Sequence, residues 1–362
     1  MVQNRKTDDE KQTKGMKVVA LEVKYLVPGM QIARDVLSSD GKILVSQGKE
    51  VSQHTIKKLQ DWQIDTVLIV QEKAANLLIR SEVQQFINTY NKSIDAIAKA
   101  FETTRKTQEI SFEVFVAANT EIQQNIPASG NIIDQLYNLP PCDDYTFRHS
   151  VNVSVIAALL AGWLGYPPEI VNQLSLAGLL HDIGKSQLPP HILNLPNRLP
   201  RSDYELYKKH THYGYELLQK VLDIPQTVKH SVIAHHERED GSGYPYGLAG
   251  DKIHPYAKIV AIADLYDEGM TISRDEDRLL SPYTALERLK ENIYKIEARA
   301  AITFIDRMTN FLSGNVVVLT DGRIGRVAFI NKDNPARSVI LLEDGQVVDL
   351  TETPEVHILH LI

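Results

Sequence analysis

Five of the twelve histidines in this 362-residue chain stand on the apolar faces of predicted helices. Residues three or four positions apart share one face of a helix. By that spacing, His149 continues an apolar stripe with Val153 and Ile156, which would direct its imidazole into the interior. Two aspartates share this behaviour, so the set expected to point inward comprises His149, His181, Asp182, His210, His235, His236 and Asp264.

Seven buried polar side chains need a common partner. A single histidine on an apolar face is more often a satisfied core residue than a metal ligand, but each unpaired buried group costs roughly 1–3 kcal/mol. Imidazole and carboxylate favour Fe, Mn or Zn over Ca or Mg. Seven ligands exceed the three or four that one catalytic ion takes from protein. We expect two divalent metal ions, Fe or Mn, with Zn, Ni or Mg as alternatives.

Asp182 is the best candidate to bridge two metals, because it is adjacent to His181 and precedes a turn at Gly184. Paired metals activate a bridging hydroxide and stabilise the oxygens of an in-line phosphoryl displacement. Lys185 follows one short turn later, where an ammonium can hold a phosphate oxygen as charge develops. The alternative for Lys185 is an exposed lysine at a helix end. Phosphoester hydrolysis is the leading chemistry, with Asp182 and Lys185 as catalytic residues.

The run Asp240-Gly241-Ser242-Gly243-Tyr244-Pro245 follows directly after the His235-His236-Glu237 segment. Glycine permits backbone shapes closed to other residues, and proline stiffens the exit of the loop. Tyr244 offers an aromatic face on which a base can stack. We therefore expect Gly243, Tyr244 and Pro245 to contact the substrate.

Composition narrows the class of protein. A net charge of −7 gives no electrostatic reason to expect binding to duplex nucleic acid or to an anionic membrane. The single cysteine, Cys142, excludes an intrachain disulfide and thiolate metal clusters. No apolar run approaches the roughly 20 residues of a membrane helix. We expect a cytoplasmic protein.

The chain is predicted to be mainly α. Residues 1–17 are polar and should form a disordered tail, and residues 18–73 alternate β-rich stretches with turns and one short helix capped by Ser52, as in a small α/β module. Residues 132–312 carry helical periodicity throughout and should form an all-α domain. Residues 313–362 return to short apolar runs separated by Asp-Gly turns, which predicts a small β element.

Between these parts, residues 74–131 should form amphipathic helices, with apolar residues such as Ile94, Ile97 and Phe101 spaced by three or four. Such helices could pair with a second subunit in a homodimer. A helical connector packed on its own domain is an equally good interpretation.

The order of these motifs resembles the HD-GYP subgroup of the HD phosphohydrolase superfamily. The resemblance covers about residues 145–274 and rests on the inward histidines and aspartates, the run His-Asp-Ile-Gly-Lys at 181–185, and the glycine-rich run after Glu237. It implies an all-α catalytic domain of the HD type and hydrolysis of cyclic di-GMP, a bacterial second messenger, to pGpG, and in some members onward to GMP.

The resemblance also implies roles for individual residues. One metal would be held by His149, His181, Asp182 and Asp264. The other would be held by Asp182, His210, His235 and His236. Lys185 would assist the nucleophile and the phosphate, Tyr244 would lie in a loop beside the substrate, and Arg274 would contact a phosphate.

Two departures from the family pattern matter. Members with three metals have a carboxylate four residues before the first histidine, and this chain has Tyr145 there, which favours two metals. After Asp267 the family usually reads Ala-(Leu or Met)-Thr-Ser-x-Arg-Pro-Tyr-Arg. Here one residue is inserted before Arg274 and the Pro-Tyr-Arg is lost. The region around Leu26-Val27-Pro28-Gly29-Met30 also resembles the small N-terminal module often fused to this family.

Three functions remain open at the level of sequence. The first is a cyclic di-GMP phosphodiesterase. The second is a cyclic-dinucleotide sensor with weak catalysis, suggested by the altered stretch after Asp267. The third is a hydrolase that uses the same metal pair on another phosphoester. A metal-free interaction protein is disfavoured, because all seven ligand positions are present.

Overall fold

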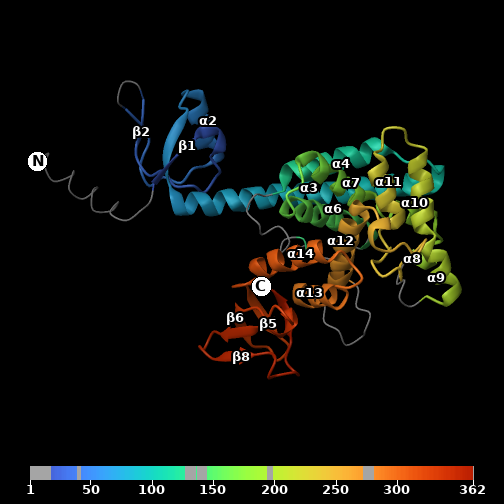
Figure 1. Cartoon of the computed structure of the whole chain (residues 1–362). Helices are drawn as coiled ribbons and strands as arrows, with labels where there is room; N and C mark the ends of the chain where they lie inside the picture. The colour runs from blue at the N-terminus through green and yellow to red at the C-terminus, as the bar shows by residue number, and fades with distance from the viewer. Residues whose placement is uncertain are drawn as a thin grey trace, which may run out of the picture. The chain divides into compact units, whose positions relative to one another are not determined.

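The computed structural model describes residues 18–38, 42–126, 136, 145–193, 199–271 and 281–361. The predicted tail of residues 1–17 and the predicted phosphate contact Arg274 lie outside the described residues. The chain divides into two compact units, Met1–Ile87 and Asn88–Ile362 (Figure 1). The domain boundaries drawn from the sequence stay predictions.

The first unit is a small α/β arrangement. Strand β1 (Val18–Glu22) pairs antiparallel with β4 (Thr66–Val70), and β2 (Val36–Leu37) pairs with β3 (Ile43–Val45). Helix α2 (Gln53–Asp61) begins where the Ser52 side chain accepts a hydrogen bond from the Thr55 backbone N–H, at 3.1 Å. After β1 the chain turns into a 3-10 helix, η1 (Val23–Tyr25).

The second unit is helical apart from its C-terminal sheet. Helix α3 (Gln71–Thr107) runs from the first unit into it. Its other helices are α4 (Phe112–Asn125), α6 (Tyr145–Trp163), α7 (Pro168–Leu180), η2 (Ile183–Gln187), α8 (Pro190–Leu193), α9 (Arg201–Lys208), α10 (His210–Gln219), α11 (Gln226–Ala234), η4 (Gly250–Lys252), α12 (Pro255–Thr271), α13 (Pro282–Glu291) and α14 (Ala298–Leu312).

Helices α6 and α7 form the centre of this unit and pack against each other. Their backbones approach closely at Gly178, where an added Cβ would lie 2.9 Å from the Cα of Ser154. The second half of α7 is buried from Leu174 to Leu180. A helix that is apolar all round belongs in a core, and this burial places the end of α7, with His181, inside the domain.

The connector helices pack on the domain that follows them. Asn119 of α4 donates from Nδ2 to Oδ1 of Asn172 at 2.7 Å, and Gln123 donates from Nε2 to Oγ of Ser175 at 2.6 Å. These contacts fit the interpretation of a connector packed on its own domain. The homodimer stays a prediction.

The C-terminal sheet has the strand order β8-β7-β6-β5-β9, with antiparallel pairs throughout. Gly322 and Gly345 adopt φ of 85° in the predicted Asp-Gly turns. The 3-10 helix η5 (Pro335–Arg337) contacts α13. The strands are β5 (Val316–Leu319), β6 (Ile324–Phe329), β7 (Val339–Leu342), β8 (Val347–Asp349) and β9 (Ile358–Leu361).

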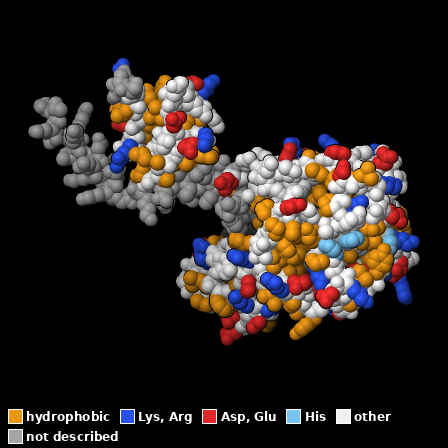
Figure 2. Space-filling view, turned by 45° about the horizontal axis from the view of Figure 1, so that its top comes forward, with side chains coloured by type: hydrophobic (Ala, Val, Ile, Leu, Met, Phe, Trp, Pro, Cys, Tyr) orange, Lys and Arg blue, Asp and Glu red, His pale blue; other side chains and the backbone are white. Residues whose placement is uncertain are grey.

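These elements confirm the predicted fold class: a mainly α protein with a small α/β N-terminal part and a small β C-terminal part. Among the described residues, no helix combines the length and the apolar character that crossing a membrane requires. Acidic and basic side chains are interspersed over the face drawn in Figure 2.

Candidate functional site

The seven inward-pointing residues come together at one place in the helical unit, and each is at most 9% exposed. Helices α6 and α12 carry His149 and Asp264 in mid-helix. The other five stand at helix ends or just beyond them: His181 and Asp182 after α7, His210 at the start of α10, and His235 and His236 after α11.

Three of the histidines use Nδ1 to cap the end of a helix. The last carbonyls of a helix lack partners within it. His181 Nδ1 lies 2.7 Å from the carbonyl oxygen of Gly178, and His210 and His235 reach the carbonyls three residues earlier at 2.7 and 2.8 Å. A carbonyl only accepts, so each Nδ1 must carry the proton. A neutral ring in this tautomer presents the lone pair of Nε2 to the interior.

The inward nitrogen atoms lie close together. His149 Nε2 is 3.1 Å from His181 Nε2, and His210 Nε2 is 3.4 Å from His235 Nε2. Two lone pairs cannot hydrogen-bond to each other, so the His210–His235 pair is unfavourable unless a cation lies against both. The donor atoms form two groups suited to a metal, one of His149, His181 and Asp182 and the other of His210, His235 and His236.

Asp182 connects the two groups. Its Oδ2 lies 3.2 Å from His181 Nε2 and 3.6 Å from His149 Nε2, while its Oδ1 lies 3.4 Å from His210 Nε2. Each oxygen of one carboxylate thus faces a different histidine group, as a bridging ligand requires. Asp264 has a similar position, with Oδ1 at 3.1 Å from His149 Nε2 and Oδ2 at 3.8 Å from His236 Nδ1.

Two buried polar atoms at this place have no hydrogen-bond partner among the described residues: Oδ1 of Asp182 and Nε2 of His236. A buried polar atom left unpaired is costly, and such an exception calls for an ion, a ligand or a water. The orphaned atoms and the converging lone pairs fit a centre that holds divalent metal.

The pKa values of the cluster favour charged aspartates and mostly neutral histidines. Burial alone would raise the pKa values of Asp182 and Asp264, but the surrounding histidines outweigh it, with help from Lys185 at Asp182, and hold both pKa values well below the usual range. Burial lowers the pKa of His210 to about 4 and also lowers those of His235 and His236. Charged carboxylates beside neutral imidazoles are the protonation states in which these side chains bind metal.

His149 is the exception, because Asp267 holds it from behind. Its Nδ1 lies 2.7 Å from Oδ2 of Asp267, which also accepts at Oδ1 from Asn152 Nδ2 at 2.7 Å. Burial lowers the pKa of His149, but the hydrogen bonds to Asp264 and Asp267 raise it to about 10. Sequence reasoning missed Asp267 and Asn152 as site residues. The spacing of Asp267 three residues after Asp264, on one helix face, was the available signal.

Lys185 reaches the cluster from η2. Its Nζ lies 2.5 Å from Oδ2 of Asp182 and 5.3 Å from the ring centre of Tyr207, and its side chain is 12% exposed. This position differs from the alternative of an exposed lysine at a helix end. Its ammonium faces the carboxylate that connects the two histidine groups.

The glycine-rich loop also lies at the cluster. The Tyr244 ring is 4.6 Å from the ring of His236 and 6.4 Å from that of His210. Gly243 passes so near the backbone of the preceding segment that an added Cβ would lie 2.5 Å from the Cα of Glu237. Glu237 fixes the far side of the loop, because its carboxylate accepts from the backbone N–H groups of Tyr246 and Leu248 at 2.8 and 2.9 Å. Pro245 follows Tyr244 through a cis peptide bond.

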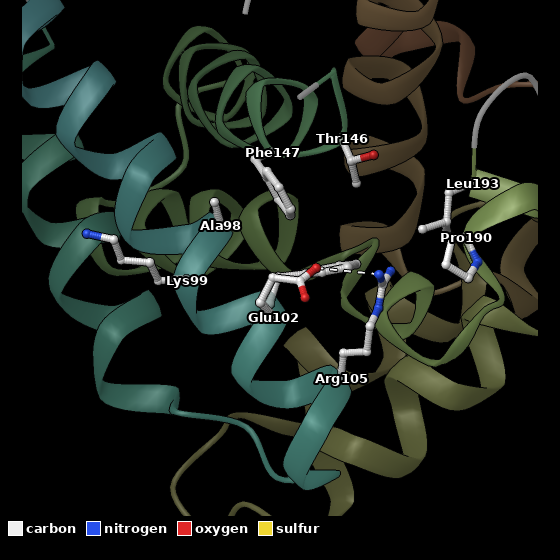
Figure 3. A pocket seen from close by; sticks show the side chains of 9 residues that line it. Ala98, Lys99, Glu102, Arg105, Thr146, Phe147, Pro190 and Leu193 are labelled. Carbon is white, nitrogen blue, oxygen red and sulfur yellow. Dashed lines mark ion pairs between the residues drawn. The ribbon is translucent and has the colours of Figure 1, made fainter. Parts of the chain in front are cut away.

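The turn η2 is held from the other side by α3. Arg105 donates from Nε to the carbonyl of Ser186 at 3.2 Å and pairs with Glu102 at 3.4 Å. Figure 3 shows this pair beside a hollow of about 490 Å³ between α3, α6 and α8. None of the seven clustered residues lines this hollow, so it is separate from the histidine cluster.

Comparison with known proteins agrees with this geometry. Residues 137–295 match the family model described as HD domain. The chain is 30% identical over 253 residues to the cyclic di-GMP phosphodiesterase PA4108 of Pseudomonas aeruginosa, covering 70% of this chain and 61% of that protein. It is 41% identical over 122 residues to the 3'3'-cGAMP-specific phosphodiesterase 1 of Vibrio cholerae, covering 34% of this chain and 28% of that one. The chain thus spans less than two thirds of either relative.

The fold has a counterpart among solved structures. Bd1817, an HDG"Y"P protein from Bdellovibrio bacteriovorus, superposes with a TM-score of 0.52 at 20% identity, over 80% of this chain and 99% of that one. Residues 137–295 are thus similar in sequence to an HD domain, and the likeness to Bd1817 extends to the fold.

Proposed function

We propose that this chain is a metal-dependent phosphodiesterase that hydrolyses cyclic di-GMP to pGpG. The observation that carries the proposal is the position of Asp182, whose two oxygens face two separate histidine groups while Lys185 contacts one of them. Relatives that bear the name of cyclic dinucleotide phosphodiesterases support the choice of substrate.

Two divalent metals would share the cluster. His149, His181, Asp182 and Asp264 would hold one, and Asp182, His210, His235 and His236 would hold the other. Bound there, a metal pair supplies an activated water-derived nucleophile and stabilises the oxygens of an in-line displacement. Fe or Mn suits this mixture of imidazole and carboxylate, with Zn as an alternative.

The chain's own residues would then prepare the reaction. Asp267 orients His149 through Nδ1, and the backbone carbonyls at the helix ends orient His181, His210 and His235 in the same way. Lys185 would neutralise charge on a nonbridging oxygen of the phosphate under attack. Tyr244, beside His236, would offer its ring to a guanine base.

The test is turnover by the purified full chain loaded with Mn or Fe(II). We expect conversion of cyclic di-GMP to pGpG, about two metals per chain by elemental analysis, and loss of activity in the double variant His181→Ala, Asp182→Ala. The matched control is His191→Ala, because His191 is exposed on α8 and belongs to neither histidine group. Absence of turnover with a fully loaded centre would count against hydrolysis and in favour of a cyclic-dinucleotide sensor.

A second candidate substrate is 3'3'-cGAMP, because the relative from Vibrio cholerae named for that substrate is 41% identical to this chain over 122 residues. The metal ligands cannot distinguish the two cyclic dinucleotides, since both present the same phosphodiester. Parallel measurement of kcat/KM for cyclic di-GMP and 3'3'-cGAMP decides between them.

A further inference from the structure

A second lysine stands at the outer edge of the cluster. Lys208 is the last residue of α9, and its Nζ lies 5.5 Å from the ring centre of Tyr204 and 5.8 Å from that of Tyr244. Its side chain is 26% exposed. The Tyr244 ring thus contacts His236 of the cluster and Lys208 of its edge.

Aromatic rings line this edge. The rings of Tyr204 and Tyr207 are stacked, with centres 6.3 Å apart and planes inclined by 14°. Tyr207 is buried, and its ring centre lies 5.0 Å from that of His210 and 5.3 Å from Lys185 Nζ. Tyr204, in contrast, is 38% exposed. The stacked pair therefore extends from the interior of the cluster to solvent, with Lys185 at its inner end and Lys208 at its outer end.

The ammonium of Lys208 is available to a ligand. Its ion-pair partner is Glu205, at 2.7 Å and three residues earlier on the same helix, and the Glu205 side chain is 58% exposed. An exposed pair of this kind contributes little free energy, because water screens it and two long side chains must be held in place. A phosphate can replace the Glu205 carboxylate at small cost.

The proposed substrate needs a second cation. A cyclic dinucleotide carries two phosphodiesters on opposite sides of one ring, and only one can be attacked at the metals beside Asp182 and Lys185. The other is a full negative charge that must lie near a site already rich in carboxylates. Lys208 offers a positive charge next to two aromatic faces, the combination that recognises a nucleotide phosphate and its base.

We propose that Lys208 binds the phosphate of the cyclic dinucleotide that is not cleaved, beside a base held against Tyr204 or Tyr244. This inference rests on the proposed function. It assigns Lys208 a role in recognition, distinct from that of Lys185, which faces the phosphate under attack.

The experiment compares Lys208→Met with the wild-type full chain on two substrates. Methionine keeps an unbranched stem against the tyrosine rings and removes the charge. The substrates are cyclic di-GMP, which has two phosphodiesters, and bis(p-nitrophenyl) phosphate, which has one. We expect KM for cyclic di-GMP to rise about tenfold, as for loss of one hydrogen bond to a charged group, with kcat little changed. Activity on bis(p-nitrophenyl) phosphate should stay within about twofold, and Lys208→Arg should restore most of the affinity for cyclic di-GMP.

The matched control is Lys209→Met, which makes the same change in net charge at the exposed neighbouring position. An equal rise in KM in both variants would reduce the effect to general electrostatics and overturn the inference. Equal loss on both substrates in Lys208→Met would assign Lys208 a structural role and overturn it too. If the wild type cleaves bis(p-nitrophenyl) phosphate and leaves cyclic di-GMP intact, the proposed function fails, and the inference fails with it.

Discussion

Gly184 is the position where a single methyl group should separate the two halves of the cluster. It lies in η2, two residues after Asp182, and packs directly on the start of α10. A Cβ built on Gly184 would fall deep inside contact distance of the His210 carbonyl oxygen and the Gly214 backbone nitrogen, and 2.9 Å from the His210 carbonyl carbon. All three atoms belong to backbone, so no side chain can rotate away.

The size of the effect follows from this geometry. Restoring ordinary contact, about 3.5 Å between heavy atoms, requires η2 and α10 to move apart by more than about 1 Å. Asp182 would move with η2 and His210 with α10, which lengthens the 3.4 Å between Asp182 Oδ1 and His210 Nε2. Overpacking of this kind costs typically 1–3 kcal/mol of stability. A misplacement of 1 Å in a catalytic group can reduce the rate about 100-fold.

We therefore expect Gly184→Ala to lower kcat/KM for cyclic di-GMP about 100-fold and to lower the metal content to below two per chain. Urea unfolding measures the loss of stability, and elemental analysis measures the metal content. The matched control is Gly162→Ala in α6, where an added Cβ meets nothing within 4 Å, so stability should stay the same or rise by about 0.5–1 kcal/mol. A Gly184→Ala variant with wild-type metal content and kcat/KM would refute the close packing of η2 on α10.

Three further changes test other contacts of the site. Arg105→Ala removes the donor to the Ser186 carbonyl and should reduce the stability by about 1 kcal/mol. It should also lower kcat severalfold, because η2 carries Lys185. The control is Lys106→Ala, at an exposed position on the same turn of α3, which should change neither quantity. Asp267→Asn weakens the contact that orients His149 and should lower metal affinity 10- to 100-fold, measured by competition with a chelator. In metal-free protein the pKa of His210 is lowered to about 4. Between pH 6.5 and 4 the unfolded chain therefore binds a proton at His210 that the folded chain does not. His210 alone should lower the stability by about 1.4 kcal/mol per pH unit as the pH drops through this range, and His235 and His236, whose pKa values are also lowered, act in the same direction. Urea unfolding between pH 7 and pH 4.5 checks this, and a flat profile would contradict the burial of neutral histidine.

The sequence pattern predicted a strand well where the strand is itself an apolar run between turn residues. The strands at Thr66–Val70, Val316–Leu319 and Val339–Leu342 lie in the parts of the chain predicted to be β-rich, and each is an apolar run closed by turn residues. Strand β9 depends on a distant partner instead. It consists of the last apolar residues, Ile358–Leu361, and it is a strand because β5, about 40 residues earlier, offers an unpaired edge. No local pattern records that partner.

The inward positions of the clustered histidines and aspartates were predictable for a similar reason. His149 and Asp264 lie in mid-helix, and their apolar stripes direct them inward as expected. The residues at the outer edge of the cluster, beside Tyr244, were harder to predict. Lys208 stands in a charged stretch that looks like an ordinary solvated helix face, and only the packing of α9 against the glycine-rich loop brings it to the Tyr244 ring.

The orientation of the histidines depends on a feature that stripes alone do not reveal. Helices α7 and α11 end at Leu180 and Ala234, directly before His181 and His235, and α9 ends at Lys208, two residues before His210, so three helix C-termini meet at one cluster. The C-terminal end of a helix carries a partial negative charge and stabilises cations. The same carbonyls that fix each Nδ1 therefore also make the surroundings of the inward Nε2 atoms favourable for divalent ions. An amphipathic pattern shows that a histidine is buried; the point at which the helix stops decides which nitrogen it presents and in what field.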